Sequence, residues 1–342
     1  MRTKETVRFA IIGCGTVAPL HAESIIAAAD AELVAVADVD QDRARAFGAR
    51  FGDPRIYGDV DRLLAADDID VVTIATPSGL HAELAVAAAQ AGKHVLCEKP
   101  LDVRADNMTK MIEAADRAGT KLGVIYQRRA YPVGLAVHAA LAEGTFGRIV
   151  LADAYLKYYR SQAYYDSAGW RGTWAMDGGG ALMNQGVHGV DMIQWLAGGI
   201  RSVFARAGHL ARRIEVEDTA VAAVEYTHGG FGVIEATTLA YPERTTRFEV
   251  HGESGTVIFD DQGLQEWHHL GGQPAPQSLA APEMAGVHSY GHYRFIEDMA
   301  AAVRNNREPL VSGREARKAV DIILAIYRSA ERGTPVTVEP SS

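Results

Sequence analysis

The feature that most constrains the fold is a glycine-rich turn between an apolar run and a helix-forming stretch. The apolar run is Val7–Ile12, and the turn reads Gly13-Cys14-Gly15-Thr16-Val17-Ala18, a G-x-G-x-x-A pattern. In a strand–turn–helix unit, Gly13 allows the tight turn, Gly15 lets backbone amides approach a pyrophosphate, and Ala18 keeps helix and strand close. Glycine-rich turns are common in α/β proteins, so this motif needs a second signal.

A carboxylate supplies that signal. Asp38 follows the second apolar run, Leu33–Ala37, and stands 25 positions after Gly13. A carboxylate at this place binds the hydroxyls of an adenosine ribose and repels a 2′-phosphate. The sequence therefore predicts a dinucleotide site that prefers NAD, rather than a structural turn followed by a surface aspartate.

The rest of the chain predicts two domains. The first 125 residues alternate apolar runs with alanine-rich helical stretches, the pattern of a parallel sheet with crossover helices. Its later strands are expected at Val71–Ala75, His94–Cys97 and Lys121–Tyr126. Beyond residue 126, strands follow one another without intervening helices, at Ile149–Tyr159, Ser202–Gly208, Thr219–Tyr226, Gly232–Leu239, Thr245–His251 and Thr256–Asp260. We expect an α/β Rossmann domain over residues 1–125. Residues 126–342 should form an α+β domain with a large, mostly antiparallel, open-faced sheet.

Two helices are expected near the end of the chain, after a long loop over residues 271–287. One spans Gly291–Asn305; the other begins at the capping box of Ser312 and Glu315 and stops at Gly333.

Composition excludes several classes of partner. The formal net charge is −9, which argues against nucleic acids and anionic membranes, since both select basic surfaces. No apolar run approaches the roughly 20 residues of a membrane span, and the N-terminus lacks the pattern of a signal peptide. Cys14 and Cys97 are the only cysteines, so no disulfide framework is expected and the cytoplasm is the predicted compartment.

A candidate catalytic group stands at the end of the strand His94–Cys97. There the sequence reads Glu98-Lys99-Pro100, which brings a carboxylate and an ammonium to the sheet edge where ligands bind. A lysine is ordinarily a solvated surface residue. The proline that fixes the backbone and the neighbouring carboxylate favour a functional lysine, and the bond before the proline can be cis.

A second cluster lies in Gly178–Asp191. Three glycines precede a predicted helix that reaches Trp195, on which Asn184, His188 and Asp191 share one face. A histidine flanked by an amide and a carboxylate is placed for proton transfer, although a lone helical histidine is usually structural. We predict no metal, because neither His188 with Asp191 nor His268-His269 matches a standard site.

Together these motifs resemble the Gfo/Idh/MocA family of oxidoreductases over essentially the whole chain. The resemblance rests on the glycine-rich turn, Thr76-Pro77 with His81, the run Ala91–Leu101, and Gly186–Asp191 as G-x-H-x-x-D. It implies oxidation of a substrate hydroxyl by hydride transfer to NAD. Lys99 would polarise the substrate oxygen and His188 would take or relay the proton.

One position departs from the inositol-dehydrogenase-like pattern. Those members have Asp four residues before the histidine, whereas this chain has Asn184, an amide that cannot share a proton but can bind a sugar hydroxyl. The segments Tyr164–Asp166, Trp170–Trp174 and Met183–Gly186 are more similar to the branch with nucleotide-sugar 3-dehydrogenases. Two alternatives stay open: an NAD-dependent glycosidase that oxidises its sugar transiently, and a non-catalytic NAD-binding regulator.

The predicted site has three parts. The catalytic residues are Lys99, His188 and Asn184. The NAD site comprises Gly13, Cys14, Gly15, Thr16, Val17, Asp38, Ala75, Thr76, Pro77, His81, Glu98, Lys99 and Gln127. Rings and guanidinium groups suit sugars and attached phosphates, so the substrate site is expected at Arg129, Tyr158, Arg160, Tyr165, Trp170, Arg171, Asn184, His188 and His292. The expected partner is a carbohydrate or polyol, and the expected assembly is a homodimer or homotetramer through the open sheet.

Overall fold

The structure is a computed structural model that describes residues 6–277 and 279–339. Internal contacts divide the chain into two compact units. The first unit extends to Gln127 and also contains Pro282–Ala316, while the second contains Arg128–Ala281 and the chain from Arg317 onward. The sequence assigned everything after residue 125 to the second domain and did not anticipate the return of Pro282–Ala316 to the first unit.

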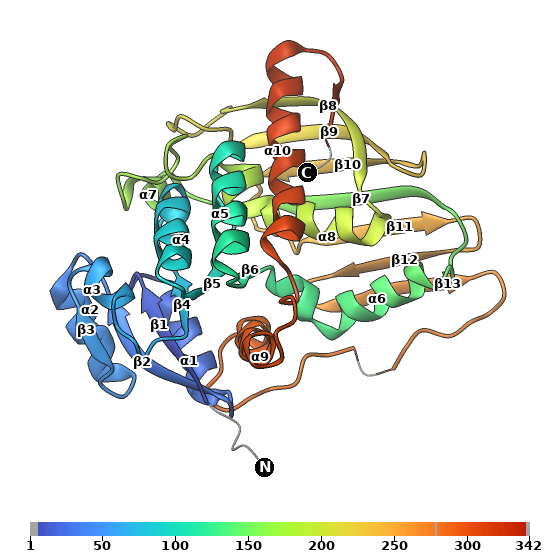
Figure 1. The fold of residues 1–342 in the computed structure, drawn as a ribbon. Helices are drawn as coiled ribbons and strands as arrows, with labels where there is room; N and C mark the ends of the chain where they lie inside the picture. The colour runs from blue at the N-terminus through green and yellow to red at the C-terminus, as the bar shows by residue number, and fades with distance from the viewer. Residues whose placement is uncertain (1–5, 278, 340–342) are drawn as a thin grey trace. The chain divides into compact units, whose positions relative to one another are not determined.

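The first unit contains a six-stranded parallel sheet in the order β3-β2-β1-β4-β5-β6 (Figure 1). Its strands are β1 (Val7–Ile12), β2 (Ala31–Ala37), β3 (Arg55–Tyr57), β4 (Val71–Ile74), β5 (His94–Cys97) and β6 (Leu122–Val124). Its helices are α1 (Ala18–Ala27), α2 (Gln41–Arg50), α3 (Val60–Leu64), α4 (His81–Gln90), α5 (Ala105–Ala118) and α9 (Tyr290–Asn305). The central strands are buried apolar runs, as a parallel sheet flanked by helices requires.

The strand order places the predicted ligand edge. The chain fills positions on one side of β1 and then crosses to β4 on the other, which makes a topological switch point at β1 and β4. The residues that directly follow β1, β2, β4 and β5 are Gly13, Asp38, Ala75 and Glu98. Because the strands are parallel, these four positions share the carboxyl edge of the sheet, where doubly wound folds bind ligands.

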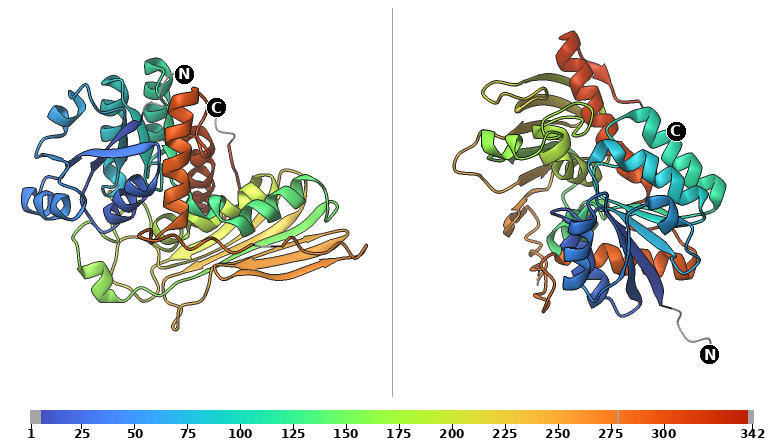
Figure 2. Two further views of the ribbon diagram at one scale, coloured as in Figure 1. Left: turned by 90° about the horizontal axis from the view of Figure 1, so that it is seen from below. Right: turned by 90° about the vertical axis from the view of Figure 1, so that its left-hand side faces the viewer.

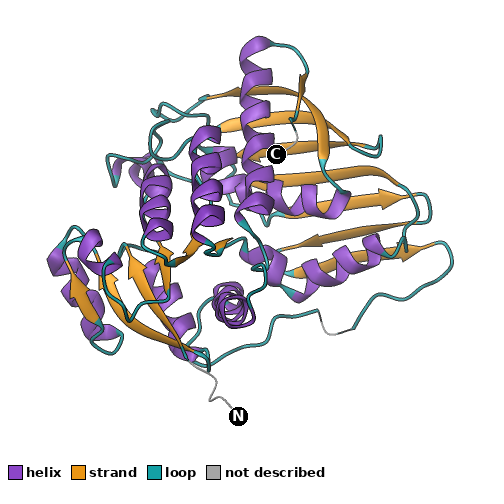
Figure 3. Ribbon diagram, viewed as in Figure 1, coloured by secondary structure: helices purple, strands orange, loops and turns teal. Residues whose placement is uncertain are grey.

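The second unit contains an eight-stranded sheet in the order β13-β12-β11-β7-β10-β9-β8-β14. Figure 3 draws the strands of both sheets in orange. Its strands are β7 (Ile149–Lys157), β8 (Ile200–Gly208), β9 (Thr219–Tyr226), β10 (Phe231–Thr237), β11 (Arg247–Gly252), β12 (Gly255–Asp260), β13 (Gly263–His269) and β14 (Val336–Thr337). All described pairs are antiparallel except β7 with β10. The predicted fold class, a Rossmann domain followed by a mostly antiparallel sheet, is confirmed.

One face of this sheet carries the helices of the second unit. Helices α6 (Pro132–Ala142) and α8 (Val187–Ala197) lie over it (Figure 2), while α7 (Gln162–Asp166) precedes α8 in the chain. Burial alternates along β9, where Ala220, Ala222 and Val224 are buried and Val221 between them is 47% exposed. Within a single chain, the second face of the sheet is therefore open to solvent.

The last helix, α10 (Gly313–Arg332), has the predicted ends. The Glu315 amide donates to Ser312 Oγ at 3.3 Å, and Gly333 follows the helix with a φ of +67°. None of the helices in the described part of the chain is both long and apolar enough to cross a bilayer.

Candidate active site

The glycine-rich turn has the geometry that its sequence predicted. Gly13 donates its amide to Ala37 O at 2.8 Å and has a φ of +94°, and an added Cβ would lie only 2.7 Å from Ala75 O. At Gly15, by contrast, an added Cβ would meet nothing within 4 Å. The first glycine is thus required by close packing of the turn against β4, while the second borders open space that a ligand can enter.

Asp38 is bound into this turn. Its Oδ2 accepts the Cys14 amide at 2.8 Å, its Oδ1 accepts the Asp40 amide at 2.8 Å, and it is 9% exposed. Arg43 Nη1 lies 3.5 Å from Oδ2. Each carboxylate oxygen still has a second lone pair for a ribose hydroxyl. Burial, with the Asp38 charge second, raises the pKa of the Cys14 thiol to about 12, so this cysteine is not a thiolate at neutral pH.

Several features fit a dinucleotide. Helix α1 begins after Val17 without a side-chain cap, so the amides of its first turn can bind a pyrophosphate, and the neighbouring Thr16 is exposed. Two buried polar atoms in the predicted cofactor set, Thr76 Oγ1 and Gln127 Oε1, have no hydrogen-bond partner among the described residues. Buried polar groups are normally paired, so a ligand with donors and acceptors would complete both.

His81 connects two of the strand ends instead of facing open space. It is fully buried, with Nδ1 2.8 Å from Pro100 O and Nε2 3.1 Å from Thr76 O. Asp102, also fully buried, accepts the amides of Ala82 and Arg104. His81 thus holds the loop after β4 against the loop after β5. Asp102 was not singled out from the sequence, because nothing in its neighbourhood marks it as a cap.

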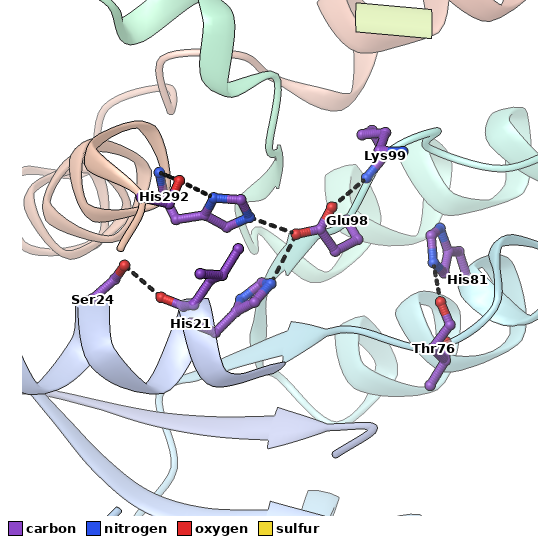
Figure 4. A network of polar contacts seen from close by, with 9 residues as sticks. His21, Ser24, Thr76, His81, Glu98, Lys99 and His292 are labelled. Carbon is purple, nitrogen blue, oxygen red and sulfur yellow. Dashed lines mark hydrogen bonds and ion pairs between the residues drawn. The ribbon is translucent and has the colours of Figure 1, made fainter. Parts of the chain in front are cut away.

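Glu98 is the centre of a buried cluster (Figure 4). Its Oε1 lies 2.9 Å from His21 Nε2 and 3.0 Å from His292 Nε2, and its Oε2 accepts the Lys99 amide at 3.2 Å. His21 comes from α1 and His292 from α9, and all three residues are at most 7% exposed. Burial alone would raise the pKa of Glu98, but the two imidazole hydrogen bonds hold it well below its usual range. The carboxylate is therefore ionised.

The cluster gives His292 partners that the sequence did not suggest. A substrate contact was expected, but Nε2 lies against Glu98 and Nδ1 lies 2.7 Å from Ser289 Oγ, with only 3% of the residue exposed. The three ligand atoms of the cluster lie within 4.8 Å of one another, close enough for a metal ion. Metal-bound histidines usually donate their other N–H to an acceptor. Nδ1 of His21 has no partner among the described residues, and we assign no metal.

In the second unit, the predicted catalytic helix begins with a π-helical segment, Ala181–Gly186, before α8. The Gln185 amide donates to Gly180 O at 3.2 Å, the five-residue spacing of a π turn. The buried Glu217 carboxylate accepts the Gly180 and Leu182 amides at 2.9 and 2.8 Å and thereby caps this segment. The sequence predicted one continuous α-helix. Because Asn184 lies in the π-helical segment and His188 in α8, the α-helical spacing that would place them on one face does not apply. The hydrogen bonds to Glu217 hold the start of the segment in place.

The glycines before this segment serve packing. An added Cβ would lie 2.0 Å from the Tyr327 hydroxyl at Gly179 and 2.0 Å from Glu217 O at Gly180. Tyr327 also donates to Glu217 Oε1 at 2.9 Å. Gly179 and Gly180 are therefore required because no larger residue fits at either position.

Asn184 is held by its neighbours. Its amide nitrogen donates to Asp177 Oδ1, and its Oδ1 accepts Gln185 Nε2 at 2.6 Å. Asp177 Oδ2 in turn accepts the Gly172 amide at 2.6 Å. Asp177 and Gln185 were not among the predicted site residues. The aspartate four residues before the histidine, absent from this sequence, is thus replaced by an amide bound to a carboxylate seven residues earlier.

His188 and Asp191 both lie on α8 and are buried, with 8% and 1% exposed. Asp191 binds Arg129 through two hydrogen bonds, Nε to Oδ2 at 2.7 Å and Nη2 to Oδ1 at 2.6 Å. The Arg129 guanidinium lies 5.1 Å from the centroid of the Trp195 ring and is 3% exposed. Arg129, expected at the substrate site, is thus a partner of the helix that carries His188.

The remaining predicted substrate residues form a cluster of rings and cations in the second unit. Arg160 lies 5.9 Å from the Tyr158 ring and 5.7 Å from the Tyr164 ring. Arg171 lies 4.4 Å from the Tyr164 ring and 4.6 Å from the Trp170 ring. Arg160, Trp170 and Arg171 are half-buried, whereas Tyr158 is buried.

Tyr165, the last member of the predicted substrate set, is buried like Tyr158. Tyr158 contacts Thr246 Oγ1 at 3.1 Å and Tyr165 donates to Thr238 Oγ1 at 3.1 Å. The half-buried members of the set thus keep part of their surface accessible, whereas these two tyrosines are enclosed.

Comparison with known proteins identifies the family. Residues 7–126 match the family described as "Oxidoreductase family, NAD-binding Rossmann fold", and residues 138–338 match its C-terminal alpha/beta domain. The crystal structure of the WlbA dehydrogenase from Bordetella pertussis, in complex with NADH and UDP-GlcNAcA, is 36% identical. It covers 99% of each chain with a TM-score of 0.91.

Two relatives of known activity are similar over almost the whole chain. D-apiose dehydrogenase from Paraburkholderia graminis is 29% identical and covers 98% of this chain and 91% of its own length. Inositol 2-dehydrogenase from Rhizobium meliloti is 27% identical over 97% and 99%. With both family domains matched and a relative of full-length similarity above 30% identity, the chain belongs to the Gfo/Idh/MocA family of NAD(P)-binding oxidoreductases.

Proposed function

We propose that the protein is an NAD-dependent dehydrogenase that oxidises a secondary hydroxyl of a nucleotide sugar. The observation that carries the proposal is the likeness to the WlbA dehydrogenase, whose bound ligands are NADH and UDP-GlcNAcA and which matches 99% of this chain. The cluster of Arg160, Arg171 and Trp170 supports it. One guanidinium group can donate to two phosphate oxygens at once, and aromatic rings stack on the apolar faces of sugars or on bases.

The preference for NAD rests on Asp38. Its carboxylate is fixed by two backbone amides at the end of β2 and can accept ribose hydroxyls, while it would repel a 2′-phosphate. Arg43, 3.5 Å away, would favour a phosphate, but its charge is already compensated by Asp38 and Asp40. Loss of Asp38 should therefore release Arg43 for NADP.

The catalytic roles follow from charge and position. When bound, NAD supplies the acceptor for a hydride. Oxidation of an alcohol also releases a proton and builds negative charge on the substrate oxygen, and Lys99 is proposed to stabilise that charge as a cation. His188 is proposed to accept the proton, because its α-helix is anchored by the Arg129–Asp191 pair and a neutral imidazole can act as a base near neutral pH.

The test is a substrate panel with purified full-length protein. UDP-GlcNAcA, other nucleotide sugars, free sugars, myo-inositol, lactate and a short-chain alcohol are each supplied with NAD, and the absorbance of NADH is followed. We expect turnover with a nucleotide sugar and none with lactate or the simple alcohol. Efficient oxidation of lactate without response to any carbohydrate would overturn the proposal. Release of free sugar without net NADH would instead indicate the glycosidase alternative.

A further inference from the structure

We propose that the buried His21–Glu98–His292 cluster makes the protein bind the oxidised, positively charged nicotinamide in preference to the reduced one. This inference rests on the proposed use of NAD and adds a charge-based role for three residues. His21 and His292 act here as positioning residues, because they hold the carboxylate and need not touch the cofactor.

The fold locates the cluster beside the nicotinamide half of the site. Asp38 after β2 receives the adenosine ribose and the turn after β1 receives the pyrophosphate. A dinucleotide bound across the switch point therefore extends its second nucleotide toward the ends of β4 and β5. Glu98 is the first residue after β5, and His21 stands one turn inside α1, whose N-terminus faces the pyrophosphate.

The hydrogen bonds keep the cluster negative. Both imidazoles direct Nε2 at the same oxygen of Glu98, so each donates one N–H to it. Protonation of His21 would bury a second N–H at Nδ1, which has no partner among the described residues. In His292, Nδ1 faces Ser289 Oγ, a hydroxyl that can donate its own proton to a neutral ring. With both imidazoles in this neutral form, the carboxylate gives the cluster a net charge of −1.

Burial makes that charge effective. His21 is fully buried, and His292 and Glu98 are 3% and 7% exposed, so little water screens the carboxylate. Two other charged groups are nearby. Lys99 donates its backbone amide to Glu98 Oε2. Asp102 is close enough that, after burial, the charges of Glu98 and Asp102 both raise the pKa of Cys97. Hydride transfer changes the nicotinamide ring from cationic to neutral. A fixed anion beside it therefore stabilises NAD⁺ and leaves NADH almost unaffected.

The experiment compares dissociation constants of NAD⁺ and NADH for full-length variants, by titration calorimetry without substrate. Glu98→Gln should weaken the binding of NAD⁺ relative to that of NADH by at least about tenfold, which corresponds to about 1.4 kcal/mol. Glu98→Asp, which keeps the charge, should retain the wild-type ratio. The matched control is Glu23→Gln, on the same helix α1 as His21, whose carboxylate lies 2.9 Å from the exposed His288. The His288 side chain is 76% exposed, so water reaches that pair, and the ratio of the two dissociation constants should not change in Glu23→Gln.

A second variant keeps the test decisive if Glu98→Gln does not fold. Lys99→Met removes a positive charge at the same strand end and should shift the ratio toward NAD⁺. If Glu98→Gln loses affinity for NAD⁺ and for NADH by the same factor, the substitution has only disturbed the structure. That result would overturn the proposal. So would an unchanged ratio in Lys99→Met, or a divalent metal bound stoichiometrically by the cluster. Failure of the native protein to bind NAD in either form would refute the proposed function instead.

Discussion

The buried pair of Arg129 and Asp191 supports the sharpest prediction about the helix that carries His188. The side chains are 4% and 1% exposed and share two hydrogen bonds of 2.7 and 2.6 Å. Removing one partner of such a pair leaves a buried charge uncompensated, which costs about 3–5 kcal/mol. Arg129→Met should therefore lower the free energy of unfolding by that amount, with a matching loss in Asp191→Leu.

A double-mutant cycle isolates the pair. Because removal of both charges leaves no buried ion, the combined variant Arg129→Met/Asp191→Leu should recover most of the loss, with a coupling energy of at least about 2 kcal/mol. The control is Arg201→Met. Its partner Glu225 lies 3.0 Å away, but the two side chains are 52% and 36% exposed, so the change should cost less than about 1 kcal/mol.

The assay is equilibrium unfolding in urea beside steady-state kinetics with the nucleotide sugar identified in the panel. Arg129 was predicted from sequence to bind substrate, and kinetics decide between the two roles. We expect the stability loss with KM for the substrate little changed in the folded fraction. An Arg129→Met protein of native stability whose KM rises tenfold or more would refute the reasoning and restore the substrate contact.

Four further predictions can be tested on the same protein. Lys99→Met should lower turnover at least about a hundredfold while NAD binding, followed by fluorescence, persists; near-normal turnover would make the motif structural. Asp38 should give NAD at least a tenfold advantage over NADP in kcat/KM, and equal efficiencies would contradict its role. Burial lowers the pKa of His21 and His81. The unfolded chain thus takes up protons near pH 6.5 that the folded chain excludes. The free energy of unfolding should fall from pH 7 to pH 5 by up to about 1.4 kcal/mol per pH unit for each histidine, and a flat profile would count against this. The open sheet face should form a dimer or tetramer, so Phe231→Glu, at a side chain 63% exposed, should yield monomers in light scattering; a native monomer at micromolar concentration would contradict the assembly.

The sequence predicted the first unit well because its signals are local. Buried apolar runs bounded by glycine and polar residues located β1 and β5 to the residue. It missed β3, a three-residue edge strand with two exposed positions. It also missed β13, whose sequence GLQEWHH has no clear alternation of apolar residues. The short strand β14 carries only two residues and gives no pattern at all.

The candidate site was predictable in its residue types and less so in its contacts. Lys99, His188 and Asp38 could be proposed from the sequence because motifs of fixed spacing carry them. The pairs Glu98–His292 and Arg129–Asp191 join residues 194 and 62 positions apart, and no periodicity connects such positions. The π-helical segment was likewise invisible, because it depends on Glu217, which stands at the end of a loop in the sequence and caps the segment only after the chain has folded.

These long-range contacts share one physical device. Buried carboxylates fix the segments that carry the proposed catalytic side chains. In the first unit, Glu98 accepts the amide of Lys99. In the second unit, Glu217 caps the start of the π-helical segment before His188, and Asp191 is paired with Arg129 one turn after His188. A buried carboxylate is costly unless its oxygens are paired, so each one demands a particular set of donors at particular distances. Apolar packing tolerates sliding and repacking, whereas such a set does not. The positions of both proposed catalytic groups are thus specified by polar contacts within their own unit.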